Sequence, residues 1–265
     1  MKPGSMKRRQ ALKAQGETTL PVDRADRRCQ PPAERVASGR MVRLVLFDID
    51  GTLVHTGGAG IKAFARVFAT EFNLTHGVER IKFAGRTDVN IVREFFFLHG
   101  ISASAENFRR FFERYVFWLD HILAESQTEA CPGVGQILRA LRALPQPPLI
   151  GLLTGNIQLG AEIKLRHFDL WREFELGAFA DDHEERDQIA HAARHRASRV
   201  LKRELRGEEI VVIGDTPLDI RCGRAIGAKV LAVATGGATL DELRPHKADW
   251  LVENLEAVTA RDLCA

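Results

Sequence analysis

The stretch VRLVLFDIDGTL, residues Val42–Leu53, decides the fold of this chain. An apolar run, Leu44–Phe47, ends abruptly at Asp48, and a second carboxylate follows at Asp50. A short run of bulky or β-branched residues, bounded by a glycine turn, predicts a buried strand of a parallel sheet. Chemistry in open α/β sheets lies just past the carboxyl ends of the strands. Two carboxylates at that edge therefore favour an active site over a plain Asp-rich turn.

The composition is that of an ordinary soluble protein, with 265 residues, 45% hydrophobic and 28% charged. No apolar run reaches the roughly 18 residues that a membrane-spanning helix needs. The N-terminus has no apolar segment of the secretory type, so we expect a cytoplasmic protein. The cysteines are scattered and form no C-x-x-C pair, which favours free thiols over a zinc site or a disulfide framework. They are Cys29, Cys131, Cys222 and Cys264.

The basic charge is concentrated in residues 1–40, which hold ten Lys and Arg against four Asp and Glu. Residues 41–265 are mildly acidic, with 28 basic against 31 acidic side chains. The first segment has scattered prolines and no sustained periodicity, so we predict a disordered basic extension. It lacks the aromatic residues that stack on bases, and nucleic-acid binding is not expected.

Residues 57–128 predict a helical insertion placed directly after the first strand. Gly57, Gly58 and Gly60 suit a hinge, because glycine permits the dihedral changes that a hinge absorbs. Apolar residues then recur at helical spacing in three segments. Most of the 15 Phe of the chain lie between Phe64 and Phe117. We interpret this aromatic density as the core of a small helical bundle, with a lipid or cofactor pocket as the alternative.

Strands and helices alternate from residue 129 to the end of the chain. This rhythm predicts an α/β fold, a doubly wound parallel sheet with helices on both faces. The core would comprise residues 41–56 and 129–265. The long helix before the fourth strand is expected at Arg186–Leu205. The expected later strands are Leu149–Leu153, Phe174–Phe179, Ile210–Ile213, Lys229–Ala234 and Trp250–Val252.

Polar residues follow several of these strands where the strands end. Because parallel strands end at one edge, Thr154 and the carboxylates Asp215 and Asp219 should converge on Asp48 and Asp50. Carboxylates gathered in this way repel one another and raise their pKa values unless a cation compensates. Oxygen-only ligands with room for water suit Mg²⁺.

Three motifs resemble signatures of the haloacid dehalogenase-like (HAD) hydrolases: FDIDGTL (47–53), LLTGN (152–156) and IGDTPLDI (213–220). Each follows an apolar strand, in the order typical of that superfamily. The insertion resembles its C1 cap, and the chain looks most like the phosphoglycolate phosphatase and β-phosphoglucomutase branch. The resemblance implies a HAD-like Rossmannoid core.

The resemblance also implies roles for the residues at the first two strand ends. Asp48 would be the nucleophile that forms an aspartyl-phosphate. Asp50 would protonate the leaving alcohol and then deprotonate the attacking water. Thr154 would donate a hydrogen bond to a phosphoryl oxygen, with backbone N–H groups near Gly155 and Asn156 at a helix N-terminus. Gly51 is a further candidate for phosphate binding. A halide leaving group needs no acid, so Asp50 argues against dehalogenation.

The metal ligands implied by the resemblance are Asp48, Asp50 through its carbonyl, Asp215 and Asp219. Asp219 would alternatively orient the basic residue of the site or a water held by the metal.

The remaining signature is a basic residue, usually a Lys followed by Pro, and no K-P pair occurs here. Arg186 is favoured because it opens a helix at the usual distance from Thr154. Lys164 is the competitor, although it lies inside the preceding helix. A solvated surface charge is the structural alternative for Arg186.

Within the insertion, Gly85-Arg86-Thr87-Asp88 marks a helix start, with Thr87 or Asp88 as the N-cap. Arg86 is a candidate for binding a second anionic group of the substrate. A simple capped turn explains the same residues equally well.

We therefore expect a Mg²⁺-dependent phosphatase with an inserted cap, active on a small phosphorylated metabolite such as phosphoglycolate or a sugar phosphate. The protein is expected to be a monomer or homodimer without membrane contact. One alternative is a phosphomutase or phosphotransferase on the same fold. The other is a non-catalytic regulator that binds a partner through its basic extension.

Overall fold

A computed structural model describes residues 41–264, which contain a six-stranded parallel sheet of order β5-β4-β1-β6-β7-β8. The strand β1 lies in the middle and pairs with β4 and β6 on its two sides. The strands are β1 (Leu44–Phe47), β4 (Leu149–Leu153), β5 (Leu176–Ala178), β6 (Ile210–Gly214), β7 (Lys229–Val233) and β8 (Trp250–Val252). The expected doubly wound α/β fold is confirmed.

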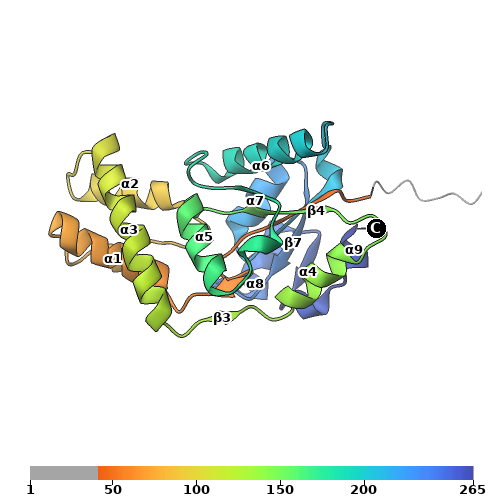
Figure 1. Cartoon of the computed structure of the whole chain (residues 1–265), viewed down its shortest axis with the longest axis horizontal. Helices are drawn as coiled ribbons and strands as arrows, with labels where there is room; N and C mark the ends of the chain where they lie inside the picture. The colour runs from red at the N-terminus through yellow and green to blue at the C-terminus, as the bar shows by residue number, and fades with distance from the viewer. Residues whose placement is uncertain (1–40, 265) are drawn as a thin grey trace, which may run out of the picture. The chain divides into compact units, whose positions relative to one another are not determined.

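Helices cover both faces of the sheet, so β1 is buried on both sides (Figure 1). Val45 and Phe47 contribute to the cluster under one set of helices, and Leu44 and Leu46 to the cluster under the other. Burying each such side chain contributes roughly 1.5–3 kcal/mol, which explains the uninterrupted apolar run. The first set is α4 (Val134–Arg142), α5 (Gln158–His167) and α9 (Ala260–Cys264), and the second is α6 (Arg186–Val200), α7 (Pro217–Ala225) and α8 (Leu240–Leu243).

The insertion, residues 57–128, contains three α-helices that lie side by side in Figure 1. They are α1 (Ala59–Phe72), α2 (Asp88–Leu98) and α3 (Ala105–Glu125). Their buried faces form a hydrophobic cluster of their own, in which the Phe68 ring stacks on Phe95 and packs against Phe111. This packing agrees with the expected bundle core. The division of the chain into domains stays a prediction.

A short antiparallel pair of strands, β2 (Val54–His55) and β3 (Glu129–Ala130), joins the helical insertion to the sheet. Gly57 and Gly58 both have positive φ values, 59° and 75°, directly before α1. A side chain at Gly57 would collide with the backbone of Gln127, so the outgoing and returning segments lie close together. This close approach and the positive φ account for glycine there.

The bounds of two expected elements differ from the structure by more than a single residue. Helix α6 ends at Val200 rather than Leu205, because Lys202 adopts a left-handed conformation (φ 54°) that no helix continues through. The third core strand, β5, is shorter than the expected Phe174–Phe179.

Short 3₁₀ segments complete the described chain at Val78–Arg80, Trp171–Glu173, Gly207–Glu209, Arg244–His246 and Leu255–Ala257. Within residues 41–264, no helix combines the length and apolarity needed to cross a membrane. The expected basic extension, residues 1–40, lies outside the described residues.

Candidate active site

Three neighbouring strands bring the first predicted residues of the site together. Phe47 of β1 is in register with Leu152 of β4 and with Ile213 of β6. Asp48 directly follows β1, and its backbone N–H donates to the Ile213 carbonyl at 2.9 Å. The parallel register therefore places Thr154 and Asp215, which follow the adjacent strands, on either side of Asp48.

A buried cluster of carboxylates lies at this edge. Ligand oxygens of Asp48, Asp215 and Asp219 all lie within 4.8 Å of one another. Burial and the neighbouring carboxylates Asp219 and Asp50 raise the pKa of Asp48 to about 6, although Arg186 opposes the rise. Burial and repulsion from Asp219 and Asp48 raise the pKa of Asp215 to about 8. A further cation would relieve this repulsion.

The surroundings of Asp215 fit a metal ligand. A Cβ at Gly236 would overlap the Asp215 carboxylate, and a Cβ at Gly51 would crowd it. Thr52 donates a hydrogen bond to Asp215 Oδ1 at 3.4 Å. The donor set contains only oxygen, which suits Mg²⁺. Asp48 and Asp215 belong to the cluster that could hold the ion, and the metal role of the Asp50 carbonyl stays a prediction.

Arg186 begins α6 and is only 4% exposed. Its Nη2 lies 2.9 Å from Asp48 Oδ1 and also bonds Asp219, while Nη1 donates to the Gly85 carbonyl at 3.1 Å. Asp219 in turn accepts hydrogen bonds from the Thr216 backbone and hydroxyl in the capping box of α7. Of the two roles expected for Asp219, these contacts favour orientation of the basic residue. A cation therefore faces the proposed nucleophile, in the place expected for Arg186.

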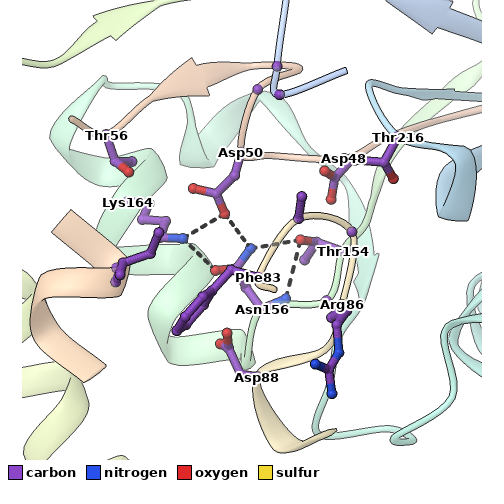
Figure 2. Close-up of a pocket in the computed structure, with 18 of the residues that line it drawn as sticks. Asp48, Asp50, Thr56, Phe83, Arg86, Asp88, Thr154, Asn156, Lys164 and Thr216 are labelled. Carbon is purple, nitrogen blue, oxygen red and sulfur yellow. Dashed lines mark hydrogen bonds and ion pairs between the residues drawn. The ribbon is translucent and has the colours of Figure 1, made fainter. Parts of the chain in front are cut away.

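Lys164 lies on α5, is 4% exposed, and contacts a different carboxylate (Figure 2). Its Nζ is 2.6 Å from Asp50 Oδ2 and 2.6 Å from Asn156 Oδ1. The Asn156 amide also donates to Asp50 Oδ2 at 2.8 Å and to Thr154 Oγ1 at 2.9 Å. The Thr154 hydroxyl thus accepts from Asn156 and keeps its own proton for an acceptor in the cavity. Arg186 and Lys164, the two candidates for the basic residue of the site, therefore contact different carboxylates of the same site.

The loop of residues 85–88 packs against the second motif. The Asp88 backbone N–H donates to the Gly155 carbonyl at 2.7 Å, and the Ile157 N–H donates to Asp88 Oδ2 at 2.9 Å. A Cβ at Gly155 would overlap the backbone of Arg86, so glycine is required for this approach. Thr87 is the N-cap of α2, accepting from the Asn90 N–H. The loop of residues 85–88 is therefore a capped helix start and also lies in direct contact with the second motif of the site.

The Arg86 guanidinium is directed along α2, the helix that begins two residues after it. It bonds the side chains of Asn90 and Glu94, and Figure 2 shows it extending away from Asp48 and Asp50. Its binding of a second anionic group stays a prediction.

A cavity of about 440 Å³ opens between these groups and the helical insertion. Gly51, Gly155 and Asn156, the candidates for phosphate binding, line it together with Arg86. The insertion contributes apolar and aromatic side chains, namely Ile61, Phe64, Phe83, Ile91 and Tyr115.

Sequence reasoning did not assign several lining residues to the site. Asp88 is one: burial raises its pKa to about 7, against the opposing effects of Lys164 and the Ile157 N–H. Its place depends on how the insertion packs against the core, which no local pattern encodes. Gly236 is another, and the Gly236-Gly237 pair after the fifth core strand was a signal that could have identified it.

Comparison with known proteins assigns the chain to a family. The family model described as haloacid dehalogenase-like hydrolase matches residues 45–233. The bifunctional riboflavin kinase/FMN phosphatase of Arabidopsis thaliana is 23% identical over 190 residues, covering 71% of this chain. The alignment covers 48% of that relative, so the chain spans about half of its length.

Two further proteins match over most of their length. Glycerol-1-phosphate phosphohydrolase 1 of Saccharomyces cerevisiae is 24% identical over 226 residues, covering 82% of this chain and 84% of the relative. A crystal structure of a CbbY variant from Rhodobacter sphaeroides, in complex with xylulose-1,5-bisphosphate, has 18% identity and a TM-score of 0.68. It covers 85% of this chain and 100% of that chain, which shows a common fold. With the family model matching more than half of its residues, the chain belongs to the haloacid dehalogenase-like hydrolases.

Proposed function

We propose that this protein is a Mg²⁺-dependent phosphatase that hydrolyses small phosphomonoesters through an aspartyl-phosphate. The observation that carries the proposal is the buried Asp48 carboxylate, with Arg186 Nη2 at 2.9 Å and the Asp50 carboxylate beside the same cavity. A nucleophile, a cation and an acid–base group are what stepwise phosphoryl transfer requires.

In the first step, an Asp48 oxygen attacks phosphorus and the ester P–O bond breaks. Asp50 gives its proton to the departing alkoxide, which leaves as an alcohol. In the second step, water attacks the aspartyl-phosphate, Asp50 takes a proton from that water, and Asp48 departs as a carboxylate. The sum is ester plus water giving alcohol plus inorganic phosphate.

The other residues of the site bind and orient the phosphoryl group. The Thr154 hydroxyl and the N–H groups near Gly155 would donate to its oxygens, and Arg186 would offset its negative charge. Mg²⁺ held by Asp48, Asp215 and the Asp50 carbonyl would neutralise charge on the phosphoryl oxygens. Asn156 and Lys164 bond the Asp50 carboxylate, which would orient it toward the leaving group.

The helical insertion would act as a cap that excludes water and contacts the leaving group. Relatives named as an FMN phosphatase and a glycerol-1-phosphate phosphohydrolase support small phosphorylated metabolites as the substrate class. Phosphoglycolate and sugar phosphates fall within that class.

Release of inorganic phosphate from p-nitrophenyl phosphate tests the proposal. We expect turnover that requires Mg²⁺ and is lost in Asp48→Asn. Equal activity in the wild type and the variant would remove Asp48 as the nucleophile. Isomerisation of a sugar phosphate without phosphate release would instead assign a phosphomutase, and no turnover of a broad panel of esters would favour the non-catalytic regulator.

A further inference from the structure

The basic side chains that line the cavity offer a basis for choosing among phosphomonoesters. In the described part of the chain, each Arg and Lys of the cavity wall is already paired with a carboxylate of the protein. The pairs are Arg186 with Asp48 and Asp219, Lys164 with Asp50, and Arg86 with Glu94. Arg186 lies at the phosphoryl end, so Lys164 and Arg86 are the Arg and Lys side chains of the wall that could face the leaving group.

Both of these cations are held by several contacts. Lys164 Nζ has two acceptors at 2.6 Å, one of them Asp50 Oδ2, and its side chain is 5% exposed. Arg86 bonds Asn90, Glu94 and the Lys82 carbonyl, all within the insertion. Binding a second anion of the substrate would require one of these cations to leave its carboxylate. The protein carboxylate left behind would then lose its partner, which offsets the gain.

The wall near the leaving group adds a carboxyl group and apolar surface. Asp88 is 8% exposed and lies on this wall near Asp50. Phe64, Phe83 and Tyr115 supply aromatic surface around it. A carboxylate or second phosphate placed here would lose its hydration, face Asp50 and Asp88, and gain no unpaired Arg or Lys. A hydroxyl group could instead donate to a carboxylate, and a carbon chain could pack against the rings.

We propose that the enzyme prefers monophosphate esters of uncharged alcohols over esters whose leaving group carries a second anion. The inference rests on the phosphatase activity proposed above and narrows its substrates. It places phosphoglycolate and bisphosphates among the poor substrates. His55, the histidine of the same wall, is the remaining basic group that an anionic leaving group could reach.

A matched pair of substrates tests the preference. Glycerol 3-phosphate and 3-phosphoglycerate differ only in a terminal hydroxymethyl group against a carboxylate. We expect kcat/KM for glycerol 3-phosphate to be at least about tenfold higher at the same pH and Mg²⁺ concentration. Equal values, or a preference for 3-phosphoglycerate, would overturn the inference.

Two variants of the insertion locate the cause of the preference. Glu94→Gln removes the charge that holds Arg86, and should raise kcat/KM for 3-phosphoglycerate several-fold without changing that for glycerol 3-phosphate. Glu113→Gln is the matched control, because it removes one exposed negative charge from α3 that, within the described residues 41–264, pairs with Arg109 alone at 3.9 Å. Its substrate ratio should equal that of the wild type. An unchanged ratio in Glu94→Gln would contradict the role given to the Arg86 pair.

Turnover of p-nitrophenyl phosphate distinguishes a failure of the substrate preference from a failure of the proposed phosphatase function. Phosphate release from this ester together with a preference for 3-phosphoglycerate would overturn the substrate preference and leave the proposed function standing. No phosphate release from any of the three esters would overturn the proposed function and the preference with it.

Discussion

Replacing Arg186 by Met should destabilise the folded protein strongly, because it removes the cation from a buried group of carboxylates. Arg186 is 4% exposed and contacts both Asp48 and Asp219. Removing one partner of a buried ion pair costs about 3–5 kcal/mol, since the other charge stays behind without compensation. We expect a loss of that size in the free energy of unfolding at pH 8 without Mg²⁺.

The loss should depend on pH, because Asp48 can escape the penalty by taking a proton. Burial already raises its pKa to about 6 from the ordinary 3.8, and Arg186 opposes that rise. Stability that comes from the neutral carboxyl is complete below pH 3.8 and is lost as the pH rises through the folded-state pKa. Without Arg186 that pKa should be higher still. The Arg186→Met variant should therefore be closer to the wild type at pH 5 than at pH 8.

Urea denaturation followed by tryptophan fluorescence measures this difference. Arg186→Lys keeps the charge and should recover part of the stability, although one amine cannot reproduce the forked contacts of the guanidinium. Arg199→Met is the control, because Arg199 is exposed on the same helix. Adding Mg²⁺ should recover part of the stability of Arg186→Met. A free energy of unfolding within about 1 kcal/mol of the wild type at pH 8 would refute the role of Arg186 as the neutralising cation.

Three further predictions concern the network, the cap contact and the metal site. Lys164→Met leaves the buried Asn156 Oδ1 without its donor. Steady-state kinetics should show a lower kcat with little change in KM. Urea denaturation should show a loss of about 1–3 kcal/mol in the free energy of unfolding. Burial raises the pKa of Asp88 to about 7 from 3.8, so wild-type stability from its neutral form is complete below pH 3.8 and is lost as the pH rises through about 7, by about 3 kcal/mol between pH 5 and pH 8. Asp88→Asn keeps an acceptor for the Ile157 N–H and should lack this loss in urea titrations at pH 5 and pH 8. Gly236→Ala places a methyl group against the Asp215 carboxylate and should weaken Mg²⁺ binding in isothermal titration calorimetry, whereas unchanged affinity would argue against Asp215 as a ligand.

The core of the fold was predictable because its signals are local. The apolar run Leu44–Phe47 requires burial on both faces, and only a parallel sheet between two layers of helices supplies that. Parallel strands end at one edge, so the convergence of Asp48, Thr154 and Asp215 followed from the strand assignment alone. Arg186 was predicted as the basic residue of the site because it stands at an expected helix start, and α6 does begin at this residue.

The contacts that depend on packing between distant segments were not predictable. Lys164 reaches Asp50 because α5 presents that side chain to the strand ends, and helical periodicity does not say which neighbour a residue on a given face will meet. Asp88 reaches the Ile157 N–H only because the insertion docks on the core. Local patterns predicted Thr87 or Asp88 as the cap, and the structure has Thr87, but such patterns contain no information on that docking.

Trapping the covalent intermediate tests the central claim most directly. During turnover, the enzyme would be quenched in acid and treated with borohydride, which reduces an acyl phosphate to the corresponding alcohol. Peptide mass spectrometry would then locate the reduced side chain. The proposed mechanism predicts conversion of position 48 to homoserine, dependent on substrate and Mg²⁺, and absent in Asp48→Asn. Sustained phosphate release with no modification at position 48, or with modification at Asp50 instead, would contradict it.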